Sequence, residues 1–108
     1  MADLVGIAAK MKVLSDAYIA QLPEKFTQLE QAWQQLPRDA WDEAGFDSFR
    51  RMVHSLSGSG ATFGLPALSK LAHELEEYLD SLAQLKVAPN TEQRDHIENL
   101  IHEFRRVT

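Results

Sequence analysis

The stretch of sequence that decides the fold is residues 46–82, which read FDSFRRMVHSLSGSGATFGLPALSKLAHELEEYLDSL. It contains two runs in which apolar residues recur every three or four positions, the spacing of one face of an α-helix. The first run is Phe49, Val53, Leu56, Gly60 and Phe63, and the second is Leu68, Leu71, Leu75, Leu79 and Leu82. Gly64 and Pro66 separate the runs, and these residues are typical of a helix end and of a first helical turn. The stretch therefore predicts two helices joined by a short turn.

The position of the turn predicts how the two helices pair. If they run antiparallel about residues 64–66, the facing pairs are Phe63 with Leu68, Gly60 with Leu71, Leu56 with Leu75, and Phe49 with Leu82. The same register places His54 within one residue of the position facing Glu76, at the margin of the leucine stripe. A carboxylate there is placed to accept the Nδ1 proton of the imidazole, which leaves Nε2 as the outward nucleophile.

His54 is predicted to face water. At about 100° per residue, the apolar residues of its helix fall within roughly 40° of one direction, and His54 lies about 140° away. The neighbours on its face, Ser57, Gly58 and Ala61, are all small. Glycine inside a helix costs about 1 kcal/mol relative to alanine, and packing does not explain Gly58 because it points outward. The missing side chain lets a bulky group or another protein approach the imidazole.

Helical spacing also marks the segments before and after this hairpin. The apolar positions are Leu4, Ile7, Met11, Leu14, Tyr18, Leu22, Phe26, Leu29, Trp33 and Leu36 on one side, and Ile97, Leu100, Ile101, Phe104 and Val107 on the other. Pro23 either kinks a long first helix or begins a second one. Residues 1 to about 12 form either an extra short N-terminal helix or a loosely attached end. Asn90 and Gln93 resemble a capping box that begins the last helix.

No segment of useful length alternates apolar and polar residues, so strands are not expected. The predicted fold is all-α: an antiparallel four-helix bundle, up-down-up-down, with residues 1–108 as a single domain. Apolar residues make up 44% and charged residues 25% of 108 residues, which is typical of one globular domain. The chain has no cysteine, which excludes disulfides and thiolate chemistry.

Charge and hydropathy exclude two further classes of function. The net charge is −5 and the basic residues are scattered, which argues against nucleic-acid binding. No apolar stretch approaches the roughly 20 residues that span a bilayer. The N-terminus also lacks the basic start and apolar run of a signal peptide. We therefore expect a cytoplasmic protein that binds neither nucleic acid nor membrane.

Residues 54–64, HSLSGSGATFG, resemble the phosphorylation motif of histidine-phosphotransfer (HPt) domains. Leu68, Leu71, Ala72, Leu75 and Glu76 resemble the family's next helix, and the likeness is close over residues 46–82. His54, Gly58, Gly64 and Glu76 match family positions directly. The resemblance implies a four-helix bundle, phosphorylation of His54, and exchange of the phosphoryl group with the aspartate of a response-regulator receiver domain. It also implies an upstream hybrid histidine kinase.

One position departs from the family pattern. The family usually has a lysine three residues after the histidine, and this chain has Ser57. A cation there steadies the phosphoryl oxygens. Arg50 and Arg51, one turn before His54, are the candidate substitutes. The predicted partner-docking residues are Arg50, Arg51, Ser55, Ser57, Gly58 and Ala61.

The sequence predicts a carrier and not a self-sufficient enzyme. No carboxylates cluster around His54 to hold Mg²⁺, so the partner is expected to bring the metal, and no cofactor is expected on this chain. The chain also lacks a glycine-rich phosphate loop with its lysine, so autophosphorylation from ATP is not expected. We expect a monomer. The alternative hypothesis is a helical adaptor that docks signalling partners without carrying phosphate, and the missing lysine is its best support.

His73, His96 and His102 lack the setting of His54 and are interpreted as surface or boundary residues. A di-iron bundle requires paired Glu-x-x-His motifs that face inward. The spacings from His73 to Glu76 and from Glu98 to His102 do not match that motif.

Overall fold

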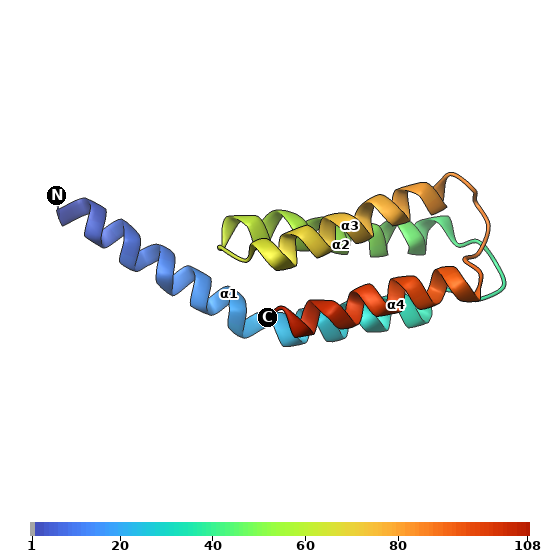
Figure 1. Ribbon diagram of the computed structural model, residues 1–108, viewed down its shortest axis with the longest axis horizontal. Coiled ribbons are helices and arrows are strands. Elements are labelled where there is room, and N and C mark those ends of the chain that lie inside the picture. The colour runs from blue at the N-terminus through green and yellow to red at the C-terminus, as the bar shows by residue number, and fades with distance from the viewer. Residues whose placement is uncertain (1) are drawn as a thin grey trace.

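The computed structural model describes the backbone of residues 2–108 and the side chains of residues 5–108. It contains four helices: α1 (Ala2–Gln35), α2 (Glu43–Thr62), α3 (Pro66–Ala83) and α4 (Thr91–Arg106). They run alternately in opposite directions, and each packs against the next along the chain, with α4 closing the bundle against α1 (Figure 1). The described residues include no strand. The predicted antiparallel four-helix bundle is confirmed.

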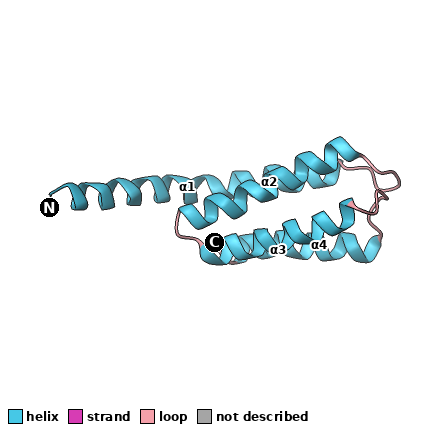
Figure 2. Cartoon of the chain, turned by 90° about the horizontal axis from the view of Figure 1, so that it is seen from above, coloured by secondary structure: helices cyan, strands magenta, loops and turns pink. Residues whose placement is uncertain are grey.

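One apolar stripe from each helix lines the core between the two layers of helices (Figure 2). The largest fully buried side chains are Leu22, Phe26, Leu29, Phe49, Val53, Leu68, Leu75, Leu79, Ile97, Ile101 and Phe104. Leu71 and Phe63, which were both predicted to lie in the core, are only half-buried because they lie at the edge of the α2–α3 interface. Ala72, the residue after Leu71, is fully buried in its place.

The turn between α2 and α3 follows the local chemistry of its residues. Gly64 adopts a φ of 75°, a left-handed conformation that glycine reaches without steric cost. The Leu65 N–H donates to the Gly60 carbonyl at 2.8 Å, which satisfies a carbonyl at the end of α2. Pro66 then begins α3, where its missing N–H is not needed. This turn fixes the register of the two helices.

The start of α4 agrees with its predicted capping box. The Gln93 N–H donates to the Asn90 side chain at 2.8 Å, and the Asn90 N–H donates to the Gln93 side chain at 2.9 Å. Two backbone donors at the helix start are therefore satisfied reciprocally.

The first helix differs from one of the predicted alternatives. α1 is a single helix of 34 residues that continues through Pro23, so an extra short N-terminal helix is wrong and Pro23 does not begin a second helix. Figure 1 shows α1 bending in its second half and its first half projecting beyond the bundle. The reason is length: the other helices have 16 to 20 residues and leave the start of α1 without a neighbour.

The buried stripe of α1 accordingly begins at Tyr18 and not at the start of the helix. Ile7, Met11 and Leu14 were predicted to share the core face but are exposed, while the side chain of Leu4 lies outside the described residues. Within the described part of the chain, no helix is both long enough and apolar enough to cross a bilayer.

Arg94 is buried, which is not expected from its charge or its place in the sequence. Its guanidinium lies 4.6 Å from the centre of the Trp33 ring, and only 7% of the residue is exposed. A cation over an indole face is stabilised by the ring's negative charge distribution. The Trp33 indole N–H donates to Glu98 at 3.1 Å, so α1 and α4 are joined by polar contacts as well as by the core.

Candidate functional site

His54 lies on the outer face of α2. The opposite face of that helix buries Phe46, Phe49, Val53, Leu56 and Gly60 in the core. The spacing of these residues turns His54 toward solvent, and 74% of its side chain is exposed. The imidazole is therefore accessible, as the sequence predicts.

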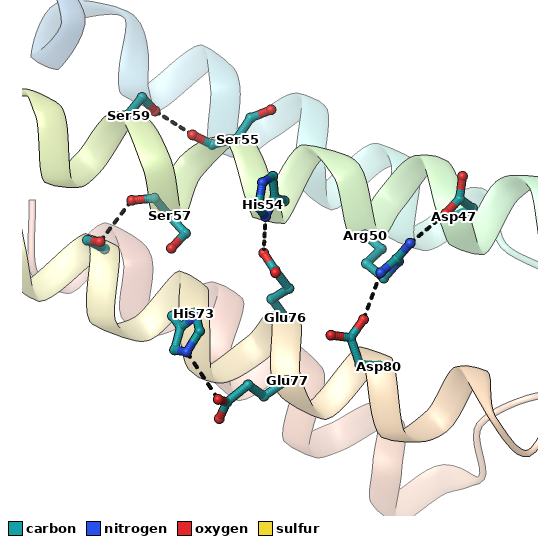
Figure 3. Close-up of polar contacts among 11 residues, drawn as sticks. Asp47, Arg50, His54, Ser55, Ser57, Ser59, His73, Glu76, Glu77 and Asp80 are labelled. Carbon is teal, nitrogen blue, oxygen red and sulfur yellow. Dashed lines mark hydrogen bonds and ion pairs between the residues drawn. The ribbon is translucent and has the colours of Figure 1, made fainter.

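Glu76 on α3 meets the imidazole from the neighbouring helix. The Nδ1 atom of His54 and the Oε2 atom of Glu76 are 2.7 Å apart (Figure 3). Because a carboxylate only accepts hydrogen bonds, the proton of this bond lies on Nδ1. The Glu76 side chain is only 18% exposed, so a half-buried carboxylate holds the exposed imidazole of His54 in place. The neutral imidazole then carries its free electron pair on Nε2, which points away from the carboxylate.

The surface beside the imidazole is uncrowded. Gly58 is exposed, and a Cβ built on it meets no atom within 4 Å. Packing therefore does not require a glycine here, in agreement with its predicted outward position. Ser55 and Ala61 are also exposed, and Ser57 is half-buried. The small residues leave open space on both sides of the ring.

A shallow depression continues from this surface toward the end of the hairpin. Its walls come from both α2 and α3, and its lining residues are Ser57, Ala61, Gly64, Pro66, Ser69, Lys70 and His73. The Ser69 hydroxyl donates to the Ser57 carbonyl at 2.8 Å and ties the two walls together. Lys70 and His73 were not predicted as site residues. The antiparallel register could have identified them, because it places both opposite the helical turn that follows Ser57.

The two arginines expected to substitute for a lysine are held by carboxylates. Arg50 donates to Asp80 at 2.8 Å and to Asp47 at 3.0 Å (Figure 3). Arg51 lies 3.0 Å from Asp47. The hydrogen bonds to Asp47 and then Asp80 raise the pKa of Arg50 above its ordinary value. Arg50 therefore lies at a fixed place one turn before His54.

The other histidines lie in different settings. The Nε2 atom of His73 lies 3.1 Å from Glu77 on the same helix, so this pair engages the opposite ring nitrogen from that of His54. His96 packs edge-on against Tyr78, with 4.5 Å between ring centres. Among the described residues, no three histidine, aspartate or glutamate side chains gather in a way that could hold a metal ion.

Gly60 explains how closely the two helices approach, but its neighbour differs from the predicted one. A Cβ at Gly60 would lie 3.2 Å from the backbone nitrogen of Ser69, not against Leu71. The hairpin is thus rotated slightly from the simple register, which also accounts for the half-buried Leu71. The contact of His54 with Glu76 is offset from the simple register in the same direction, by one residue.

A four-helix bundle that presents a solvent-facing, carboxylate-bound histidine defines the histidine-phosphotransfer class of protein. The family model described as Hpt domain matches residues 13–107. The chain therefore belongs to the Hpt domain family and is a phosphotransfer module. It is also similar to the chemotaxis protein CheA of Halobacterium salinarum, with 29% identity over 82 residues. That match covers 76% of this chain and 12% of the CheA sequence. No solved structure matches the chain significantly.

Proposed function

We propose that His54 carries a phosphoryl group between this module and the aspartate of a receiver domain. The single observation that supports this best is the 2.7 Å contact between Nδ1 of His54 and Glu76, combined with 74% exposure of the histidine side chain. Together these features supply a nucleophilic nitrogen with a defined electron pair and access for a protein partner. His73 is also exposed beside a glutamate, but Glu77 contacts its Nε2 and not its Nδ1.

The proposed reaction needs no group on this chain beyond those described. The electron pair on Nε2 attacks the phosphorus of the receiver's aspartyl phosphate, and the bond from phosphorus to the aspartate oxygen breaks. The aspartate leaves as a carboxylate, and the phosphorylated imidazole gains positive charge. Glu76 accepts the Nδ1–H bond throughout and stabilises that charge. Donation of the phosphoryl group to a second aspartate is the same step in reverse.

In this proposal, the receiver domain and this chain both neutralise the negative charge of the phosphoryl oxygens. Phosphoryl transfer depends mainly on positioning and electrostatic stabilisation. We assign Mg²⁺ to the carboxylates of the receiver domain. On this chain, Ser57 offers a hydroxyl where the family usually has a lysine, and Arg50 is the guanidinium one turn before His54. Arg50 supplies its charge by exchanging Asp80 for a phosphoryl oxygen.

The docking face proposed for the receiver surrounds His54. It comprises the predicted residues Arg50, Arg51, Ser55, Ser57, Gly58 and Ala61. Lys70 extends it, because this exposed lysine lines the adjoining depression and forms no ion pair among the described residues. Small residues at the centre and basic residues at the rim suit a protein surface that carries an acidic active site. An upstream hybrid histidine kinase, a cytoplasmic location and the absence of kinase activity on this chain are parts of the same proposal.

A helical adaptor without phosphate is the second candidate function. The observation that favours it is the engagement of Arg50 and Arg51 by Asp47 and Asp80, with a serine in place of the lysine. An adaptor would use the same face to dock partners but would not require Nε2 of His54.

Phosphoryl labelling separates the two candidates. The full chain is incubated with a phosphorylated receiver domain and Mg²⁺, and the acid-labile phosphoryl group on the chain is counted by mass spectrometry. We expect one group on the unmodified chain and none on the His54→Gln variant. His73→Gln is the matched control, because His73 is also exposed and lies beside a glutamate. Undiminished labelling of His54→Gln would refute the site, and no labelling of the unmodified chain would favour the adaptor.

A further inference from the structure

The projecting first half of α1, residues 2–17, forms an arm that carries a large share of the chain's exposed apolar side chains. The exposed fractions are 73% for Val5, 57% for Ile7, 42% for Met11, 67% for Val13 and 53% for Leu14. A helix with apolar residues on several sides is normally buried. Contiguous apolar surface of this kind marks an interaction site.

The arm also has little intrinsic reason to remain helical alone. Without the rest of α1, a helix of this length would be only a little above the roughly 12–15 residues below which isolated helices are marginal in water. The arm contains Gly6 and the β-branched residues Val5, Ile7 and Val13, all of which lower helix propensity. A surface that covers the apolar side chains of the arm would therefore stabilise its helical state.

One face of the arm has the spacing of a coiled-coil seam. Ile7, Met11, Leu14 and Tyr18 are separated by four, three and four residues, and Leu4 continues the pattern in the sequence. Apolar residues spaced on average by about 3.5 positions are packed against another helix in coiled coils. At Tyr18 the seam runs into the buried core. On the other side of the arm, Lys12 and Asp16 form an ion pair at 2.9 Å.

In place of the monomer expected from the sequence, we propose that this seam packs against the arm of a second copy of the chain, with the two arms antiparallel. Charge favours this occupant. The arm holds two aspartates and two lysines and is neutral, so the net charge of −5 lies on the remainder of the chain. Two neutral arms meet without repulsion, and the antiparallel arrangement keeps the two acidic bundles at opposite ends. A parallel pair would bring the bundles side by side.

The spacing also fixes a register for the pair. With the two-fold axis at residue 9, Ile7 of each copy lies opposite Met11 of the other. The residues that border the seam include Ala8, Ser15 and Ala17, which are small enough for the helix axes to approach closely. His54 lies on the bundle and not on the arm, so the dimer leaves the phosphotransfer face open.

Molar mass in solution tests the assembly. By sedimentation equilibrium, the full chain should reach twice its monomer mass of 12.2 kDa as concentration rises. Ile7→Asp and Leu14→Asp should both reduce the mass to that of the monomer, and Val13→Asp, on the far side of the arm, should not. A native chain that stays at 12.2 kDa up to millimolar concentration overturns the proposal. Equal dissociation by Val13→Asp also overturns it, because the seam would not be the contact.

Disulfide crosslinking tests the orientation, because the chain has no cysteine of its own. In the antiparallel register, a mixture of the Ile7→Cys and Met11→Cys chains should crosslink under mild oxidation, with each variant alone crosslinking much less. Efficient self-crosslinking of Met11→Cys alone indicates a parallel pair and overturns the proposed orientation. Circular dichroism of each variant verifies that the bundle remains folded.

Discussion

His54 of α2 and Glu76 of α3 meet across the hairpin with 2.7 Å between Nδ1 and Oε2, the imidazole exposed and the carboxylate mostly covered. The pairing follows from the register set by the turn at Gly64. The same register brings Arg50, four residues before His54, to Asp80, four residues after Glu76, at 2.8 Å. Two polar pairs therefore border one edge of the α2–α3 interface, and the contact with Glu76 fixes the direction in which Nε2 points.

Removal of the carboxylate should change the tautomer of His54. A hydrogen bond of this kind contributes about 1 kcal/mol net, so Glu76→Ala should shift the ratio of tautomers roughly fivefold toward the Nε2–H form. The ¹⁵N chemical shifts of the imidazole measure this ratio directly. Glu77→Ala is the control, because Glu77 contacts His73 and not His54. An unchanged His54 spectrum in Glu76→Ala would count against the proposed role of the carboxylate.

The two glycines of α2 should respond to alanine in opposite ways. Gly58→Ala should raise the free energy of unfolding by about 1 kcal/mol, because the helix gains propensity and the new Cβ meets nothing. Gly60→Ala should lower it, because its Cβ would lie 3.2 Å from the backbone nitrogen of Ser69. Urea denaturation measures both changes. Destabilisation by Gly58→Ala would show that this position is constrained by packing after all.

Restoration of a cation three residues after His54 should strengthen the phosphorylated state. Exposed ion pairs contribute about 0.2–1 kcal/mol, so Ser57→Lys should lengthen the lifetime of the phosphohistidine by up to about fivefold. The decay of the acid-labile label measures this lifetime. Ser48→Lys adds the same charge at an exposed position nearer the start of α2 and should have no effect. Equal lifetimes in all three proteins would mean that the chain needs no cation at Ser57.

A bulky residue beside the imidazole should block the partner without unfolding the bundle. Gly58→Trp fills the open space next to His54, so it should weaken binding of a receiver domain by at least about tenfold, a loss of roughly 1.4 kcal/mol. Isothermal titration calorimetry measures the affinity, and thermal unfolding checks the fold. The matched control, Ser48→Trp, should bind normally. If Gly58→Trp also binds normally, the receiver docks elsewhere.

Much of the fold could be predicted because local chemistry and global packing agree. Helix ends are marked by Gly64, Pro66 and the Asn90–Gln93 pair. Each of these residues favours a particular backbone conformation or cap, and the helices begin or end at them as predicted. The leucine stripe of α3 and the apolar stripe of α2 then fix the register. That register brings Glu76 to within one residue of the position facing His54.

The remaining features depend on tertiary relationships that a single sequence does not contain. Apolar spacing alone cannot tell that the stripe of α1 leaves the bundle before Tyr18, because exposure there depends on where the other helices end. Arg94 reads as a surface residue, and only the position of the Trp33 ring explains its burial. The register could have predicted the pairing of Arg50 with Asp80. A long, charged arginine side chain is equally stable in solvent, however, so the sequence alone does not require that pairing.

The most direct test of the central claim is the site of the nitrogen–phosphorus bond. The chain, uniformly labelled with ¹⁵N, is phosphorylated by a receiver domain and studied by NMR for coupling between ³¹P and the imidazole nitrogens. We expect coupling to Nε2 of His54, with Nδ1 still protonated and bonded to Glu76. Coupling to Nδ1 of His54, or to any nitrogen of His73, His96 or His102, would contradict it.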